Sequence, residues 1–273
     1  MARTGLCGAI LAAGHGSITT GTPKLLEKLN SGCTIIEAVV HLLYAQLEIY
    51  DLAVAVNTVY SGLICNKIGE NFRGIIYAHQ LSRRGTADAA RLCVEALQHD
   101  CLREQLDDIL IVYGDMPLWQ PKSLGALIDS HRAAKATLSM FAIDVSDFAP
   151  TETVSQFGRI LHDASGKIIA VKEPYQMDDT DHAQWQNCQR VNPSAWVFNV
   201  DWLMDNIQHL QPHDKGDGFA PELWLPDLVP LAVAQDKLVL ELPLADYYEA
   251  LGVNALSDLV RVRKIYRQRY AHV

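Results

Sequence analysis

Short apolar runs alternate with amphipathic segments through the first half of the chain, and this pattern limits the folds that it can adopt. Five runs have the length and composition of buried strands: residues 8–12, 52–56, 74–78, 109–113 and 136–143. Helical patterns lie between them, from residue 34 and at 87–97 and 121–134, and Thr34 and Glu37 form a capping box at the first. Alternation without hairpins indicates βαβ units, so we predict a parallel sheet with right-handed crossovers.

The second half has a different pattern. We predict a hairpin of strands 158–162 and 167–171 joined by a turn at 163–166, a surface loop at 174–190, and then strand 195–200, helix 219–234, strand 237–242 and a terminal helix at 255–270. Neither a linker nor an internal repeat interrupts the chain. The expected fold is therefore one α/β domain spanning 1–273, with a Rossmann-like, mixed but mostly parallel sheet flanked by helices and a small inserted β region.

Composition excludes several classes of protein. Among 273 residues, 49% are hydrophobic and 20% are charged, which is the composition of a globular chain and not of a disordered one. The net charge of 23 − 32 = −9 argues against general nucleic-acid binding or binding to an anionic membrane surface, because both need basic patches. Small phosphorylated ligands remain open, since a local cluster of donors is enough to bind them.

The cysteines and the N-terminus indicate a cytoplasmic protein. No C-x-x-C pair occurs among the six cysteines, Cys7, Cys33, Cys65, Cys93, Cys101 and Cys188, so neither a zinc site nor a disulfide framework is expected. Residues 5–13 also resemble the apolar region of a signal peptide. We favour a buried strand here because the run leads directly into a glycine-rich segment with a chemical use of its own.

That segment follows the first predicted strand. Gly14, Gly16 and Gly21 lie between Leu11 and Lys24, where their amide N–H groups can form a nest for an anion at the carboxyl end of a strand. Lys24 adds a point charge for phosphate, although a solvated lysine at a helix start is the alternative. The spacing matches neither the Walker P-loop nor the dinucleotide fingerprint.

The glycine segment, L-A-A-G-x-G followed by P-K, resembles the signature of the sugar-1-phosphate nucleotidyltransferases. Further segments resemble, in order, the uridylyltransferase domains of bacterial bifunctional N-acetylglucosamine-1-phosphate enzymes. They are 84–89 (RGTADA), 113–118 (YGDMPL), 157–160 (FGRI), 171–173 (VKE), 191–192 (VN), 221–227 (PELWLPD) and 252–254 (GVN). The resemblance spans about residues 5–268. It covers the first domain of such enzymes and not their acetyltransferase β-helix, which the 273 residues do not contain.

The resemblance implies roles for individual residues in a nucleotide-binding half, about 1–135. Lys24 would contact phosphate, Gln80 would read the uracil edge, and Gly85 and Thr86 would hold the base. The full set of expected nucleotide-binding residues is Leu11, Ala12, Ala13, Gly14, Gly16, Lys24, Gln80, Gly85 and Thr86. A glutamine amide offers both a donor and an acceptor, which the uracil edge requires. For Gln80, an exposed position at a strand end is the alternative.

A Mg²⁺ site is also implied by the resemblance, with Asp115 and Asn254 as its ligands. Asp115 follows the apolar strand 109–113, and a carboxylate at that end of a strand suits a hard, oxygen-ligated cation. The alternatives are a turn cap for Asp115 and an N-cap of the last helix for Asn254. We expect Lys24 and Asp115 to be the catalytic residues.

In the other half, about 136–273, the resemblance implies an amino-sugar pocket. Gly158, Glu173 and Asn192 fall where the family holds the sugar: the carboxylate and the amide can bridge hydroxyls, and the glycine leaves room for the ring. A surface charge at a strand edge is the alternative for Glu173.

The chain departs from the family at several positions. Ile18 stands where the signature has an arginine that neutralises phosphate charge, and the loop is one residue shorter. Arg83 or Arg84, next to Gly85, could replace that charge. On the sugar side, Pro193 and Ser194 replace Thr-Gly, and Pro221 replaces a glycine.

These features together predict a cytoplasmic enzyme that joins UTP and N-acetylglucosamine 1-phosphate, with Mg²⁺, into UDP-N-acetylglucosamine, a cell-wall precursor, and pyrophosphate. Two alternatives remain: a related enzyme that takes another nucleotide or sugar phosphate, or a catalytically impaired protein that binds nucleotide sugars. No nucleic acid or membrane is expected as a partner. Since the usual trimer contacts come from the β-helix, a monomer or dimer is favoured over a trimer.

Overall fold

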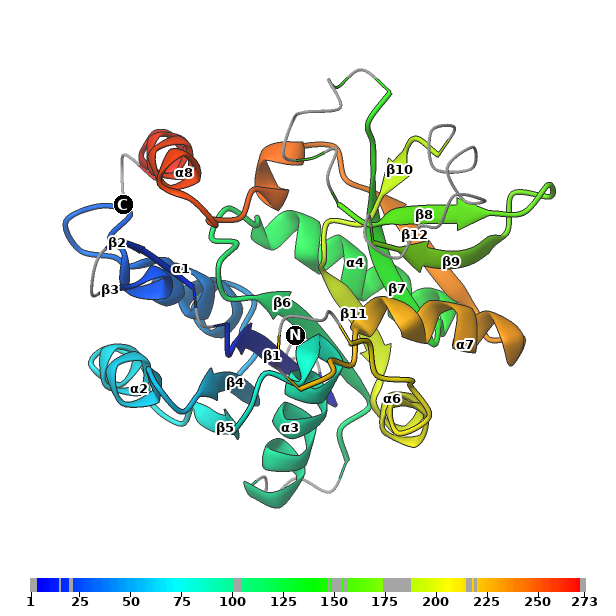
Figure 1. Ribbon diagram of the computed structural model, residues 1–273, viewed down its shortest axis with the longest axis horizontal. Helices are drawn as coiled ribbons and strands as arrows, with labels where there is room; N and C mark the ends of the chain where they lie inside the picture. The colour runs from blue at the N-terminus through cyan, green and yellow to red at the C-terminus, as the bar shows by residue number, and fades with distance from the viewer. Residues whose placement is uncertain are drawn as a thin grey trace.

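Ten strands of the described residues form one mixed sheet with helices on both of its faces, and two further short strands pair with each other in a separate ribbon (Figure 1). The computed structural model describes residues 4–14, 16–19, 22–100, 105–146, 148, 154, 157–173, 188–214, 218 and 220–270. The strand order is β5-β4-β1-β6-β11-β7-β10-β8-β9, and β12 pairs with β7. The strands are β1 (Leu6–Ala12), β4 (Leu52–Asn57), β5 (Ile76–Gln80), β6 (Asp108–Tyr113), β7 (Leu138–Asp144), β8 (Arg159–His162), β9 (Ile168–Lys172), β10 (Arg190–Val191), β11 (Trp196–Asn199) and β12 (Val239–Pro243).

The direction of the strands confirms the predicted fold class. β5, β4, β1 and β6 are parallel neighbours. β11 lies antiparallel between β6 and β7, so β7 and its parallel neighbour β12 run in the same direction as that block. The predicted hairpin, β8–β9, extends the sheet at its far edge, and its turn contains Gly166 at φ 82°. This part is the small inserted β region.

Two layers of helices cover the sheet because the side chains of each central strand alternate between its faces. Leu6, Ile10 and Ala12 of β1 point into one apolar core, and Cys7 and Ala9 point into the other. The first core also contains residues of α1 (Ile35–His41), α2 (Ser61–Gly69), α4 (Pro121–Ala134) and α8 (Leu256–Arg269), and the second those of α3 (Gly85–Asp100), α6 (Val200–Ile207) and α7 (Leu228–Ala234).

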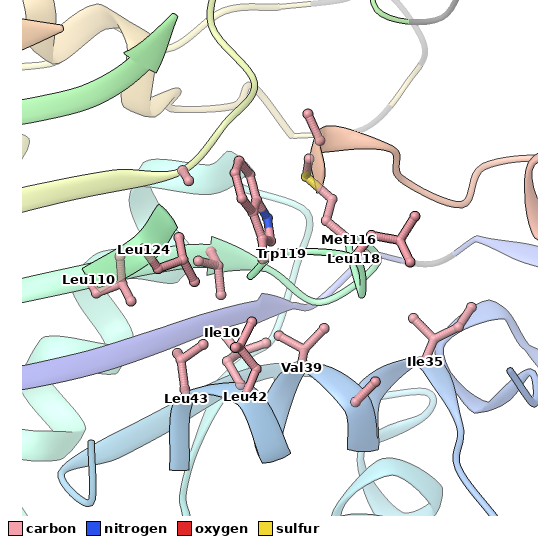
Figure 2. Close-up of a cluster of buried hydrophobic side chains, with 14 of the residues drawn as sticks. Ile10, Ile35, Val39, Leu42, Leu43, Leu110, Met116, Leu118, Trp119 and Leu124 are labelled. Carbon is pink, nitrogen blue, oxygen red and sulfur yellow. The ribbon is translucent and has the colours of Figure 1, made fainter. Parts of the chain in front are cut away.

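Figure 2 shows part of the first core, where Val39 of α1 and Leu43 of the turn that follows it point toward Ile10 of β1. The helix begins as predicted, since Thr34 accepts a hydrogen bond from the N–H of Glu37 (3.4 Å) and Glu37 accepts one from the N–H of Thr34 (2.9 Å). A π-helical turn, η2 (Leu42–Gln46), continues α1. Trp119, just beyond β6, is buried against Phe141 with their rings stacked.

The helix predicted for 219–234 is wrong in its first half. A 3₁₀ turn, η5 (Leu225–Asp227), leads into α7, while the preceding residues are extended, with Glu222 bridged to His213 and Leu223 hydrogen-bonded to Arg84. Pro221 and Pro226 explain the difference, because each lacks an N–H for a helix and disfavours helical geometry in the residue before it. Residue 219 lies outside the described residues.

Other elements were not predicted. α2 and α6 were missed, as were the two short strands of the glycine loop, β2 (Ser17–Thr19) and β3 (Thr22–Pro23), and the 3₁₀ turns η1 (Lys24–Leu26) and η6 (Tyr247–Ala250). Most of the predicted loop 174–190 lies outside the described residues, and its last residue belongs to β10.

The described residues also show the state of the cysteines and whether any helix could span a membrane. Cys7, Cys33, Cys65, Cys93 and Cys188 are free thiols, whereas Cys101 lies outside the described residues. Within the described ranges, no helix combines the length and apolar content needed to cross a membrane.

Candidate active site

The carboxyl ends of the parallel strands bring the predicted residues to one edge of the sheet. β1 ends at the glycine segment, β5 ends at Gln80, and β6 ends two residues before Asp115. The end of β1 and the loop after β6 are joined, since the N–H of Gly114 donates to the carbonyl oxygen of Leu11 (2.9 Å). This edge is where parallel sheets bind their ligands.

Two cavities open at this edge. The first, of about 200 Å³, is lined by Leu11, Ala12, Ala13, Gly14, Lys24, Leu25, Gln80, Arg83, Gly85, Thr86, Ala89, Tyr113, Asp115 and Glu222. The second, of about 340 Å³, is lined by Thr86, Tyr113, Asp115, Met116, Phe157, Glu173, Ser194, Glu222, Trp224, Pro226, Gly252 and Asn254. Thr86, Tyr113, Asp115 and Glu222 line both, so the cavities adjoin.

The predicted nucleotide-binding residues gather around the first cavity. All of them line it except Gly16, whose carbonyl oxygen instead accepts a hydrogen bond from the N–H of Lys24 (3.2 Å). The side-chain amide of Asn57, at the end of β4, donates a hydrogen bond to the carbonyl oxygen of Gly14 (3.0 Å) and so ties the glycine segment to β4. The backbone of this loop is thus tied to Lys24 and to the neighbouring strand.

Lys24, Asp115 and Asn254 meet where the two cavities adjoin. The ammonium of Lys24 lies 2.6 Å from Asp115 Oδ2 and 2.9 Å from Asn254 Oδ1. The N–H of Val253 donates to the carbonyl oxygen of Asp115 (3.0 Å), which fixes the segment that carries Asn254 beside β6. Asn254 does not cap α8 with its side chain, because Asp258 accepts the N–H groups of Asn254 and Ala255.

Gln80 is buried and already hydrogen-bonded. Its amide nitrogen donates to the carbonyl oxygen of Gly85 (3.0 Å) and to the buried carboxylate of Asp88 (2.9 Å). Both amide hydrogens are therefore used, and the carbonyl oxygen of the side chain is the group left to meet a base. The alternative of an exposed strand-end residue does not hold.

Gly85 and Thr86 connect the first half of the chain to the segment before α7. Gly85 has φ 87°, and a Cβ atom there would lie 2.2 Å from the carbonyl oxygen of Leu223. That oxygen accepts from the N–H of Ala87, and the hydroxyl of Thr86 accepts from the N–H of Leu225 (3.0 Å). The glycine thus lets the two segments close over the cavities.

The residues predicted to bind the sugar do not all line one cavity. Glu173 lines the second cavity, whereas Gly158 and Asn192 do not. A Cβ atom on Gly158 would lie 3.0 Å from Glu173 Oε1, so this glycine leaves space for the carboxylate. Asn192 is buried, and its Oδ1 accepts from the N–H of Ser194 (2.9 Å), a residue with φ 64°. Asn192 therefore holds the turn that places Ser194 at the cavity.

Tyr113 was not given a role from the sequence. It lines both cavities together with Thr86, and Ser194 lines the second beside it. Burial raises the pKa of Tyr113 well above the ordinary value, and the nearby charges of Glu173 and Asp115 raise this pKa further, so the phenol is neutral at physiological pH. Its place two residues before Asp115 was the signal that could have identified it.

Glu222 and Trp224 were noted only as parts of a motif. Trp224 donates its indole N–H to Glu222 (2.9 Å), and Glu222 lies 3.5 Å from Arg83. His213 stacks on the indole ring at 3.8 Å and contacts Asp227 (2.6 Å). Arg83 also lines the first cavity, and a substitute for the signature arginine would have to lie there. The backbone carbonyl oxygen of Arg84 accepts a hydrogen bond from the N–H of Leu223, and Arg84 is not among the described residues that line the two cavities.

The residues at the junction fit a magnesium ion. Mg²⁺ binds oxygen ligands, keeps several waters and is held by one or two carboxylates together with substrate phosphates. Asp115 and Asn254 offer a carboxylate and an amide oxygen that already converge on one cation, the ammonium of Lys24. Among the described residues, no group of three or more His, Cys, Asp and Glu offers a different metal site.

The chain is similar to known proteins. Residues 8–172 match the model of the MobA-like NTP transferase domain. The chain belongs to this family. It is 27% identical over 98% of its length to the bifunctional protein GlmU of Dichelobacter nodosus, and 28% identical over 95% to that of Streptococcus equi subsp. zooepidemicus. It spans about half of the length of these relatives, 53% and 51%.

Solved structures share the fold. One is a Bacillus anthracis chain named as a glucose-1-phosphate thymidylyltransferase, in complex with a sucrose, with a TM-score of 0.69 at 17% identity over 96% of this chain and 95% of that one. Another is a CMP:2-keto-3-deoxy-manno-octonic acid synthetase complexed with CTP, with a TM-score of 0.65 at 14% identity over 97% and 99%. At these identities the likeness shows a common fold.

Proposed function

We propose that the protein transfers the uridylyl group of UTP to N-acetylglucosamine 1-phosphate and releases pyrophosphate. The observation that carries this proposal is the meeting of Lys24, Asp115 and Asn254 at the junction of the two cavities. Nucleotide in the first cavity and sugar phosphate in the second would bring their phosphates together there. Membership of the NTP transferase family and the motifs that resemble uridylyltransferase domains support the choice of reaction and substrates.

The reaction needs positioning and charge neutralisation, and no protein nucleophile. An oxygen of the sugar phosphate, already ionised, attacks the α-phosphorus in line with the departing pyrophosphate. The amides of the glycine loop and the ammonium of Lys24 hold the triphosphate, and Gln80 accepts a hydrogen bond from the base. Asp115 and Asn254 would hold Mg²⁺, which when bound supplies positive charge to the phosphate oxygens. Glu173 and Ser194 would bind sugar hydroxyls.

The rest of the proposal concerns the whole molecule. The chain would act as one unit, with the half at about 1–135 binding the nucleotide and the half at about 136–273 binding the sugar. The setting would be the cytoplasm, the product a cell-wall precursor, and the assembly a monomer or dimer.

A second candidate rests on Ile18. Without the arginine of the signature, the chain would bind nucleotide sugars and turn them over slowly or not at all. Arg83 lines the first cavity but pairs with Glu222, so it is available to a triphosphate only if that pair opens.

The test is a panel of the four ribonucleoside triphosphates and several sugar 1-phosphates with Mg²⁺, in which released pyrophosphate is measured. We expect the fastest release with UTP and N-acetylglucosamine 1-phosphate, and none from an Asp115→Ala variant. Faster release with another pair of nucleotide and sugar phosphate would assign that pair as the substrates in place of the proposed one. Tight binding of UDP-sugar in calorimetry without any release would favour the second candidate.

A further inference from the structure

Lys24 occupies the position proposed for the metal. Its ammonium contacts the two oxygens that would bind the ion, at 2.6 Å from Asp115 Oδ2 and 2.9 Å from Asn254 Oδ1. The side chains of Lys24 and Asp115 are only 13% and 20% exposed, so water screens this pair incompletely. A divalent cation that binds the same oxygens must meet the positive charge of Lys24 or displace it.

We propose that Lys24 is an internal cation that keeps the metal site closed until nucleotide arrives; this rests on the proposed function. A metal ion alone must break two hydrogen bonds to Lys24, one of them charged on both sides, and receives nothing to compensate the displaced ammonium. A triphosphate supplies that compensation, because it offers the ammonium new oxygen partners. Metal and nucleotide then bind together far better than either binds alone.

The backbone around Lys24 allows this exchange of partners. The N–H of Lys24 is tied to the carbonyl oxygen of Gly16, so the residue belongs to the loop that would hold the phosphates. Its aliphatic stem lies against Gly16, where a Cβ atom would be 3.3 Å from Lys24 Cδ. With the backbone fixed, rotation about the side-chain bonds can carry the ammonium from Asp115 to a phosphate in the adjoining first cavity.

Linkage gives this arrangement a measurable sign. If nucleotide strengthens metal binding by some factor, metal strengthens nucleotide binding by the same factor. A variant without the ammonium loses the competitor, so metal alone binds more tightly to it although a residue of the site has been removed. A lysine that served only to bind phosphate would leave the affinity for free metal unchanged when removed.

The experiment measures binding of Mn²⁺ alone, by the electron paramagnetic resonance signal of the free ion and by calorimetry. We expect Lys24→Met to bind Mn²⁺ about tenfold or more tightly than the unaltered protein, since a charge-assisted hydrogen bond no longer opposes it. Lys28→Met, an exposed lysine near Lys24 in the sequence, is the matched control and should bind as the unaltered protein does. Adding Asp115→Asn to Lys24→Met should abolish the gain.

Equal or weaker binding by Lys24→Met, with both proteins folded by circular dichroism, would overturn the inference. So would an equal gain in Lys28→Met, because general charge would then explain it. These outcomes are separate from the fate of the proposed function. A protein that releases no pyrophosphate with any substrate pair, yet gains Mn²⁺ affinity on loss of Lys24, would retain the internal cation and lose the proposed reaction.

Discussion

The Cβ position of Gly85 lies 2.2 Å from the carbonyl oxygen of Leu223, so no side chain fits between the loop that opens α3 and the extended segment before α7. These residues are far apart in the sequence, and each is next to a residue that lines both cavities, Thr86 and Glu222. Leu223 is bonded on both sides, from its N–H to Arg84 and from its oxygen to Ala87. The glycine is therefore as much a condition of the fold as of the site.

Gly85→Ala is expected to destabilise the protein by roughly 2–4 kcal/mol, because the new methyl group meets backbone atoms and φ 87° is unfavourable for alanine. Unfolding in urea measures this. The matched control is Gly62→Ala in α2, where nothing lies within 4 Å of the added carbon. There, stability should stay the same or rise by about 0.5–1 kcal/mol, because alanine favours a helix. Equal effects of both variants would contradict the assigned role of Gly85.

We expect Asn254 to contribute mainly to activity and Asp258 mainly to stability. Asn254→Ala removes an oxygen that contacts Lys24 and no cap of α8, so we expect a loss of activity of at least tenfold, with stability changed by less than about 0.5 kcal/mol. Asp258→Ala removes the acceptor of two N–H groups at the start of α8, which should cost about 1 kcal/mol of stability. A large loss of stability in Asn254→Ala would instead indicate a cap.

Arg83→Met tests whether Arg83 replaces the arginine that the family signature has at the position of Ile18. If its guanidinium leaves Glu222 for the triphosphate, kcat/KM for the nucleotide should fall about tenfold to a thousandfold, as on removal of a donor to developing charge. Arg73→Met, an exposed arginine before β5, should have no effect. Full activity in Arg83→Met would exclude it as the substitute. A rise in activity of Ile18→Arg would support the importance of the missing charge.

Asp108 is the first residue of β6 and lies at the end of that strand opposite the site. We expect it to make the stability of the protein depend on pH. Burial raises the pKa of this carboxyl, but His131 and Arg132 outweigh that effect and hold the pKa below its ordinary value. Since the folded pKa is depressed, the stabilisation is present above the unfolded pKa and is lost as pH falls through the folded pKa.

Asp108→Asn should therefore cost roughly 1–2 kcal/mol of unfolding free energy at pH 7 and less at pH 3. Urea unfolding at several pH values measures the difference, with the exposed Asp205→Asn as a control that stays within about 0.5 kcal/mol. A penalty that grows toward low pH would contradict the assignment.

Much of the fold could be predicted because local patterns and tertiary packing agree in it. The runs that became β1, β4 and β6 are buried on both faces, and such strands are continuously apolar. The first half of the predicted helix 219–234 was wrong because its apolar pattern was given more weight than Pro221 and Pro226. In the structure that pattern belongs to an extended segment. α6 was missed since it follows β11 without a connecting loop, at Val200.

The site was predictable to the extent that its residues follow strands. Gln80 is the last residue of β5 and Asp115 lies two residues after β6, so the sheet itself brings them together. Glu222 and Tyr113 line both cavities and Trp224 lines the second, and these positions depend on contacts between distant segments, which no local spacing records. Asn192 was predicted to bind the sugar from the order of motifs, and its hydrogen bond to Ser194 could only be seen in three dimensions.

The central claim is the transfer of a uridylyl group to an amino-sugar phosphate, and the most direct test is the product itself. The protein is incubated with Mg²⁺, N-acetylglucosamine 1-phosphate and an equal mixture of all four ribonucleoside triphosphates, and the nucleotide sugars are separated by chromatography and weighed by mass spectrometry. The predicted result is UDP-N-acetylglucosamine as the main product, absent with Asp115→Asn. No nucleotide sugar, or one that carries another base, would contradict it.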